Sequence, residues 1–181
     1  MALSELVRKK YVVWFNMVDR NKDGFLTIED FQLAQASWNG LFENQPASTL
    51  YIKIAGYWTG MWEGLKLGDT DQDGKVSLEE FLAFIDMTRQ MEGNLEMGLA
   101  WGQTTIDAFD ANHDGVISLD EWKRIYEING LSAELAERTF TILDGDGDGV
   151  LSPEEYLKRI EEFMIAEDMD APGNHFYGVI E

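Results

Sequence analysis

Four short stretches of the chain carry acidic or amide side chains at every second position, a spacing suited to holding a metal ion. The first reads DRNKDGFLTIED over residues 19–30, and the others occupy residues 69–80, 110–121 and 144–155. Each begins Asp-x-Asp/Asn-x-Asp-Gly and ends with an acid, and we call them loops 1 to 4. Calcium takes about six to eight oxygen ligands at roughly 2.3–2.6 Å, and alternating carboxylates supply them as a loop winds round the ion.

Each loop has five predicted metal ligands, at its positions 1, 3, 5, 7 and 12. Position 7 offers its backbone carbonyl, whereas the other four offer side-chain oxygens. In loops 1 and 2 the predicted ligands are Asp19, Asn21, Asp23, Phe25 and Asp30, and Asp69, Asp71, Asp73, Lys75 and Glu80. In loops 3 and 4 they are Asp110, Asn112, Asp114, Val116 and Glu121, and Asp144, Asp146, Asp148, Val150 and Glu155. We therefore predict Ca²⁺ as the bound ion, at up to four sites.

Loop 1 differs from the others at its last position, where Asp30 stands in place of glutamate. A glutamate at this position can chelate calcium with both oxygens. The shorter aspartate is expected to reach the ion with one oxygen or through water, which lowers the coordination number toward six. Because Mg²⁺ demands about six ligands at roughly 2.0–2.1 Å, we expect Mg²⁺ to compete best at loop 1.

Other positions of the repeat predict the elements that hold each loop in place. Glycine at position 6 permits a positive φ, and Ser or Thr at position 9 with an acid three residues later has the spacing of a helix-starting capping box. Position 8 is apolar, so we predict short strand contacts of Leu26 with Val76 and of Ile117 with Leu151. Apolar side chains at helical spacing flank every loop. This pattern predicts the EF-hand, a helix, a twelve-residue loop and a second helix.

Four such hands predict an all-α fold built from two pairs. We expect the N-terminal pair within residues 1–92, the C-terminal pair within residues 93–167, and a tail over residues 168–181. The tail is expected to dock on the core because its last residues are too apolar for a free end, namely Phe176, Tyr177, Val179 and Ile180. The long interval between loops 1 and 2 predicts a break around Pro46 and then a helix capped by Ser48.

The connection between the pairs, residues 81–109, indicates whether the pairs touch. A helix break is expected at Glu92, Gly93 and Asn94. The apolar side chains around it are expected to be buried, namely Met87, Met91, Leu95, Met97, Leu99 and Trp101. An exposed polar linker would separate the two pairs, so this apolar connection predicts that they pack into one compact globule.

Composition narrows the classes of partner and chemistry. The 181 residues include 34 acidic and 14 basic ones, which gives a formal charge of −20, and the chain has no Cys. Such a charge repels nucleic acid and anionic membranes and favours cations. No apolar run reaches the roughly 18 residues that a membrane span needs. We expect a cytoplasmic monomer that is not an enzyme, since the chain offers neither a Cys nucleophile nor a His-centred triad.

The first hand, FNMVDRNKDGFLTIEDF, and the tail sequence NHFYGV resemble the sarcoplasmic calcium-binding proteins, including the bacterial calerythrin type. The resemblance covers nearly the whole chain. It implies a compact four-hand globule that buffers Ca²⁺ and Mg²⁺ and has little exposed target groove. Many members of that family have lost one hand, whereas all four loops keep their ligands here.

Two alternatives to a buffer stay open on the sequence. A calcium sensor would expose a Met-rich groove to a protein partner, and the chain has 8 Met, although they are spread over many predicted helices. The superfamily also resembles photoproteins and luciferin-binding proteins, which hold an apolar ligand in a central cavity. The six Trp and six Tyr could line such a cavity or pack the core. Photoprotein chemistry uses buried His, whereas we expect His113 in solvent and His175 at the surface or in packing.

Overall fold

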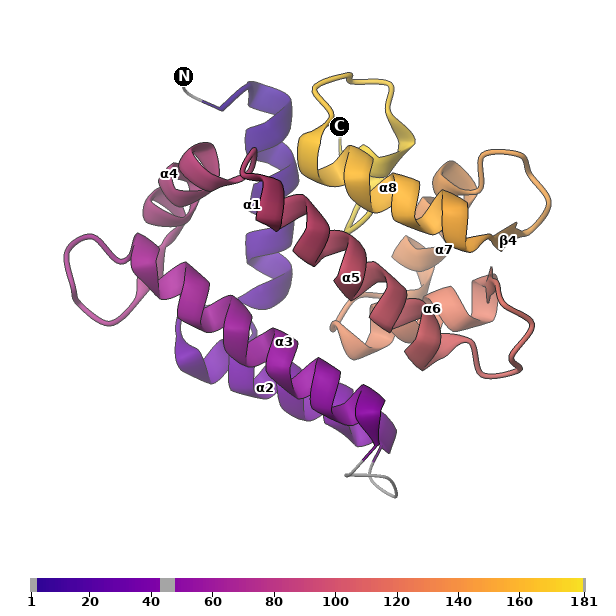
Figure 1. Ribbon diagram of the computed structural model, residues 1–181. Coiled ribbons are helices and arrows are strands. Elements are labelled where there is room, and N and C mark those ends of the chain that lie inside the picture. The colour runs from indigo at the N-terminus through magenta and orange to yellow at the C-terminus, as the bar shows by residue number, and fades with distance from the viewer. Residues whose placement is uncertain (1–2, 43–47, 181) are drawn as a thin grey trace.

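The computed structural model describes residues 3–42 and 48–180, and helices dominate these ranges (Figure 1). The first half contains α1 (Glu5–Val18), α2 (Ile28–Asn39), α3 (Thr49–Leu65) and α4 (Leu78–Thr88). The second half contains α5 (Glu92–Phe109), α6 (Leu119–Ile128), α7 (Ala133–Leu143) and α8 (Pro153–Ile165). Short 3-10 turns occupy Gly40–Phe42, Lys66–Gly68 and Pro172–His175. Each loop lies between two helices, so the predicted EF-hand architecture is confirmed.

Short antiparallel strands join the loops in pairs. β1 (Phe25–Leu26) pairs with β2 (Val76–Ser77), and β3 (Ile117–Ser118) pairs with β4 (Val150–Leu151). Leu26 lies opposite Val76 and Ile117 lies opposite Leu151, which is the predicted register. These four side chains are buried, because the apolar residue at position 8 points into the core on the inner side of its loop.

Hydroxyl side chains start the helices that follow the loops. In loops 2, 3 and 4 the serine at position 9 accepts a hydrogen bond from the backbone N–H of the glutamate at position 12. Ser48 caps α3 in the predicted way, since its Oγ accepts from the backbone N–H of Tyr51 at 3.2 Å. The predicted break around Pro46 lies outside the described residues.

The two pairs pack against each other, as predicted. Trp38 of α2 is buried against α5, with its ring centroid 4.6 Å from that of Trp101 and 5.4 Å from that of Phe109. The indole N–H of Trp38 also donates to Asn129 Oδ1 at 3.2 Å, beyond the end of α6. α5 contacts both α3 and α8, and Figure 1 shows it crossing the molecule between them.

The connection between the pairs departs from the prediction in two ways. α4 ends at Thr88 and α5 begins at Glu92, so the break spans residues 89–91 instead of Glu92, Gly93 and Asn94. Three methionines that were expected to be buried are exposed: Met87 (69%), Met91 (56%) and Met97 (43%). The physical reason is that Arg89 occupies the buried position in this turn, which leaves Met87 and Met91 beside it exposed, and Met97 is partly exposed on α5. Trp101, one turn further along α5 from Met97, is buried as predicted.

The tail lies on the second half of the molecule. Phe176 is buried against Trp122 and Tyr156, with ring centroids 5.4 and 5.3 Å away. Its backbone carbonyl accepts a hydrogen bond from the Tyr126 hydroxyl at 2.8 Å. Within the described ranges, no helix is long and apolar enough to cross a bilayer.

Lys10 fixes the first helix against the last. Its side chain is fully buried, and Nζ donates to the carbonyls of Glu162 at 3.1 Å and Ala166 at 2.7 Å, at the C-terminal end of α8. A cation is favourable there because the helix dipole places partial negative charge on these carbonyls. Burial, and then the charge of Arg89, nevertheless lower the pKa of Lys10 from 10.5 to about 8.

This lowered pKa gives stability a specific dependence on pH. Between about pH 8 and pH 10 the unfolded chain keeps a proton that folded Lys10 releases, so the free energy of unfolding should rise with pH. We expect a rise of about 1–2 kcal/mol between pH 7.5 and 9.5 in urea melts at saturating metal. Lys10→Met should abolish the rise, and the same rise in that variant would assign it to other groups.

Candidate functional site

The four loops share one backbone conformation, which turns N–H groups toward the centre of each loop. The glycines at position 6, Gly24, Gly74, Gly115 and Gly149, have φ between 85° and 87°. Position 4 is also left-handed, with φ between 60° and 74° at Lys22, Gln72, His113 and Gly147. Sequence reasoning missed this second left-handed position, because three of the four residues there are not glycine. Gly147 was the one signal that could have indicated it.

The side chains at positions 1, 3 and 5 are arranged by these N–H groups. In every loop the aspartate at position 1 accepts a hydrogen bond from the N–H of the position 6 glycine at 3.0 Å. The side chains at positions 3 and 5 each accept from the N–H two residues later, at 2.9 to 3.2 Å. A backbone N–H thereby fixes one oxygen of each side chain, and both oxygens of Asp23, Asp110, Asp114 and Asp144 accept hydrogen bonds within their loops.

The acid at position 12 closes each loop by reaching back to its beginning. Glu80, Glu121 and Glu155 each accept from the N–H of position 2 with one oxygen and from the serine at position 9 with the other. Hydrogen bonds from Ser77 and then from Thr70 lower the pKa of Glu80 to about 2, so this carboxylate is ionised at neutral pH.

Asp30 makes the same contacts in loop 1 despite its shorter side chain. Its Oδ1 accepts from the N–H of Arg20 at 2.9 Å, and its Oδ2 accepts from the N–H and the hydroxyl of Thr27, both at 2.9 Å. Asp30 is fully buried, whereas Glu80 and Glu155 are half-buried. Glu121 is also buried, so Asp30 closes loop 1 from a buried position as the longer Glu121 does in loop 3.

Loop chemistry fits a divalent cation with oxygen ligands. The Oδ1 atoms of Asp19 and Asp69, at position 1 of loops 1 and 2, are buried and have no hydrogen-bond partner among the described residues. A buried carboxylate oxygen without a partner is costly, and a metal ion at the loop centre would satisfy it. The carboxylate of position 12 lies against the start of its loop, where it accepts from the N–H of position 2. Metal ligation by the twenty predicted residues stays a prediction.

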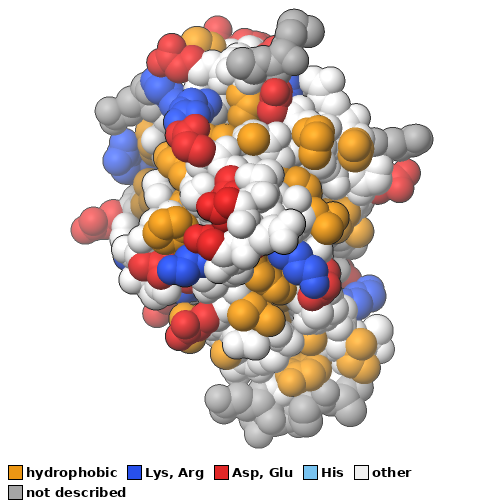
Figure 2. Space-filling model, turned by 90° about the vertical axis from the view of Figure 1, so that its left-hand side faces the viewer, with side chains coloured by type: hydrophobic (Ala, Val, Ile, Leu, Met, Phe, Trp, Pro, Cys, Tyr) orange, Lys and Arg blue, Asp and Glu red, His pale blue; other side chains and the backbone are white. Residues whose placement is uncertain are grey.

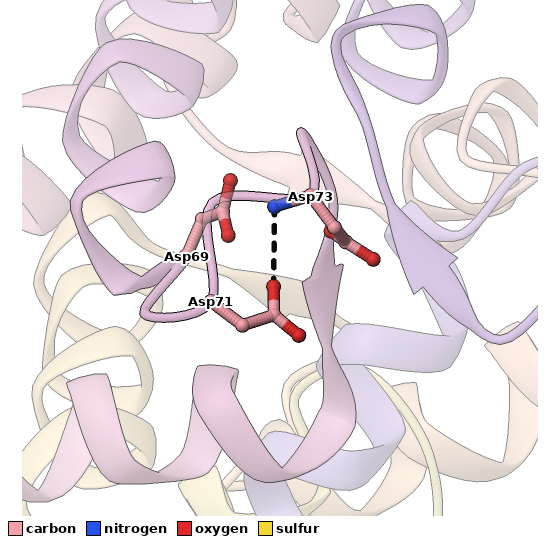
Figure 3. A group of neighbouring side chains, drawn as sticks. All are labelled: Asp69, Asp71 and Asp73. Carbon is pink, nitrogen blue, oxygen red and sulfur yellow. Dashed lines mark hydrogen bonds between the residues drawn. The ribbon is translucent and has the colours of Figure 1, made fainter.

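Loops 2 and 4 are the most strongly anionic. Asp69, Asp71 and Asp73 offer carboxylate oxygens that all lie within 4.8 Å of one another, and Asp144, Asp146 and Asp148 do the same. Figure 3 shows the three side chains of loop 2 projecting from one turn of the chain, with the Asp73 N–H donating to Asp71. Loops 1 and 3 have Asn at position 3, and its Nδ2 donates to the aspartate at position 5.

A cavity of about 340 Å³ lies between the two pairs and forms a second candidate site. It is bounded by residues of α1, α3, α4, α5, α8 and the tail. Most of the side chains around it are aromatic or aliphatic, and they include Tyr11, Trp14, Tyr57, Met61, Leu65, Phe81, Phe84, Ile85, Met97, Trp101, Ile160, Phe163, Met164, Phe176 and Tyr177. The aromatic residues therefore serve both of the roles considered on the sequence. Some of them line the cavity, whereas Trp38, Trp58 and Trp122 pack in the core and do not line it.

Neither histidine is placed at this cavity. His113 is exposed at position 4 of loop 3, as expected. His175 is half-buried in the tail, where its Nδ1 accepts a hydrogen bond from the N–H of Ile180 at 3.0 Å. None of the described residues that surround the cavity is histidine.

Comparison with known proteins agrees with this geometry. The EF-hand domain pair family matches residues 10–86, and the EF-hand family matches residues 103–126 and 135–160. Obelin from Obelia longissima is 37% identical over 94% of this chain and 90% of its own. Among solved structures, a sarcoplasmic calcium-binding protein from amphioxus has a TM-score of 0.72 at 18% identity, covering 99% of this chain and 100% of its own.

The fold extends to a protein named for an organic ligand. The coelenterazine-binding protein from Renilla muelleri has a TM-score of 0.65 at 24% identity and covers 98% of this chain and 100% of its own. At this identity the likeness concerns the fold alone. The matched EF-hand segments and the identity to obelin give the assignment: the chain belongs to the EF-hand family of calcium-binding proteins, and it shares its fold with a sarcoplasmic calcium-binding protein.

Proposed function

We propose that this protein is a cytoplasmic Ca²⁺/Mg²⁺ buffer with up to four EF-hand sites. The observation that carries the proposal is that all four loops keep a full ligand set while the apolar faces of the two pairs are turned toward each other inside one globule. Trp38, Trp101 and Phe109 fill this contact. A sensor needs that apolar face for a partner and exposes it on binding calcium. A closed globule is instead suited to holding ions without signalling.

The surface supports a buffer over a sensor. Figure 2 views the side of the molecule from which loop 2 projects, and acidic and hydrophobic side chains are interspersed there. The exposed methionines Met87, Met91 and Met97 lie around a single turn, and no partner for them follows from the structure. The formal charge of −20 fits a monomer that binds cations and has neither nucleic acid nor membrane as a partner.

Ion selectivity is proposed to differ between the sites. In loop 1, Asp30 is fully buried and both of its oxygens lie on N–H groups of the loop itself. Its side chain is one methylene shorter than glutamate, which limits it to one oxygen on the ion and favours the six-ligand geometry of Mg²⁺. Loop 1 is therefore proposed to be the least calcium-selective of the four sites.

A second candidate function is the transport or storage of an apolar ligand. The cavity of about 340 Å³ supports it, because small-molecule sites are usually concave, mostly apolar and about 300–1,000 Å³ in volume. The fold is also shared with a coelenterazine-binding protein. A carrier is favoured over a photoprotein, since the described residues around the cavity include no histidine.

Calorimetric titration tests the assignment of loop 1. Wild-type protein titrated with Ca²⁺ in millimolar Mg²⁺ should lose affinity at one site more than at the other three. Asp30→Glu should restore calcium preference at that site, because the longer arm can chelate the ion with both oxygens. Glu121→Asp is the matched control and should create a second Mg²⁺-tolerant site in loop 3. An unchanged Mg²⁺ effect in Asp30→Glu would contradict the proposal.

Binding of an apolar dye separates a buffer from a sensor. The dye is added to the Mg²⁺-loaded protein and then to the Ca²⁺-loaded protein, so that any dye in the central cavity contributes to both readings. We expect a fluorescence change of less than about two-fold, because a buffer barely opens on binding calcium. A large rise on exchange of Mg²⁺ for Ca²⁺ would show an exposed groove and favour the sensor.

A further inference from the structure

We propose that the central cavity binds a single-chain amphiphile with a carboxylate head, a molecule of the fatty-acid type, and that Arg89 anchors the head. This inference rests on the carrier function proposed above and is independent of the buffer function. The inference follows from the buried Arg89, from the charged side chains near it, and from the glycines and aromatic rings of the cavity wall.

Arg89 is the buried cation at the cavity. It is 7% exposed, in the turn between α4 and α5, and it contributes to the cavity wall together with Thr88 and Asn94. Its Nη2 is paired with Glu167, whereas Nη1 is buried and has no hydrogen-bond partner among the described residues. Guanidinium N–H groups form a planar fork whose best acceptor is a carboxylate. Arg89 thus lines the cavity and carries an unused donor that matches a carboxylate head.

Charges near Arg89 also favour an anion. Lys10 is fully buried and close enough to Arg89 for that charge to lower its pKa, and Arg159 is buried and ion-paired with Glu162. The carboxylates of this cluster already have donors: Glu162 accepts from Arg159 at 3.0 Å and from the N–H of Gly173 at 2.8 Å. Three cations therefore face two carboxylates, in a chain whose net charge is otherwise strongly negative.

Glycines leave open space in the cavity wall for an apolar chain. Gly60 and Gly64 lie one turn apart on α3 and line the cavity, and a Cβ added at either would meet no atom within 4 Å. Close packing therefore does not require glycine at these two positions. Helix stability does not favour it either, because glycine destabilises a helix interior. Gly98 and Gly102 on α5 are different, because a Cβ there would come within 2.2 Å of Met164 and 2.4 Å of Ile160.

The remaining wall suits a hydrocarbon tail. Trp14, Phe81 and Phe163 present ring faces and edges, with the Trp14 and Phe81 rings stacked at a centroid distance of 5.3 Å. A neutral apolar ligand would also fill this space, but it would leave Nη1 of Arg89 without an acceptor. Nη1 is already buried and unpaired, and a carboxylate head would supply the acceptor that it lacks, which is why the site should prefer a charged head.

Dodecanoate and dodecanol, titrated separately into delipidated full-length protein, test the proposal, because they share one chain and differ in charge. The protein is kept in its Mg²⁺ form to avoid calcium soaps, and quenching of tryptophan fluorescence reports binding near Trp14 and Trp101. We expect one dodecanoate per chain, bound at least ten-fold more tightly than dodecanol. Arg89→Gln should remove this preference while leaving dodecanol binding unchanged, and Arg89→Lys should retain part of it.

Two further variants control for non-specific effects. Arg8→Gln removes an exposed arginine, ion-paired with Glu79, and should bind dodecanoate like the wild type. Gly60→Leu should fill the cavity and weaken both ligands at least ten-fold, with an unchanged number of Ca²⁺ ions bound, which shows that the variant is folded.

Each outcome of these titrations has a distinct meaning. Equal binding of dodecanol and dodecanoate, insensitive to Arg89→Gln, would overturn the carboxylate anchor and leave a carrier of neutral ligands. Binding that survives Gly60→Leu would place the ligand outside the cavity and overturn the proposed site. Binding of neither ligand would overturn both the anchor and the carrier function, and the buffer function would stand.

Discussion

Repulsion between loop carboxylates is the interaction on which the rest of the structure depends. Loops 2 and 4 each hold three carboxylates with oxygens within 4.8 Å, and backbone N–H groups satisfy only part of their hydrogen-bonding capacity. The buried Oδ1 atoms of Asp19 and Asp69 have no donor among the described residues. A divalent cation relieves the repulsion and supplies the missing partner at once. Metal binding and stability are therefore linked, and the loops hold their shape best when loaded.

This electrostatic constraint reaches the core through a few hydrogen bonds. The acid at position 12 both closes its loop and caps the following helix, so a change at the ion is passed to that helix. Arg20 of loop 1 donates from Nη2 to the carbonyl of Ile128 in the other half at 2.8 Å. Arg159 donates to the carbonyl of Leu143, next to loop 4, and holds Glu162, which accepts from Gly173 of the tail. Loop 1 is thus coupled to the opposite half of the molecule, and loop 4 is coupled to the tail.

Much of the fold followed from local chemistry that the sequence displays directly. The loops, their capping residues and the pairing of Leu26 with Val76 depend on residue types at fixed spacing, and such features were predictable. The exposed Met87 and the buried Arg89 were not, because hydrophobicity alone ranks them in the opposite order. Their places depend on where the turn between α4 and α5 lies in the globule. The left-handed position 4 was missed for a similar reason, since the closed loop imposes it on Lys22 and Gln72.

The cavity and the metal sites share one framework, because the same helices build both. α1, α3 and α5 lead into loops 1, 2 and 3, α4 and α8 leave loops 2 and 4, and all five line the cavity. A core arranged only for stability would place alanine or leucine at Gly60 and Gly64 and would not bury a donor of Arg89 without an acceptor. If a ligand in the cavity binds the metal-loaded form more tightly, it must raise metal affinity by the same factor. Metal binding and ligand binding would then be linked in one equilibrium. In that equilibrium the ions set the positions of the helices, and the helix positions determine how well the cavity is closed.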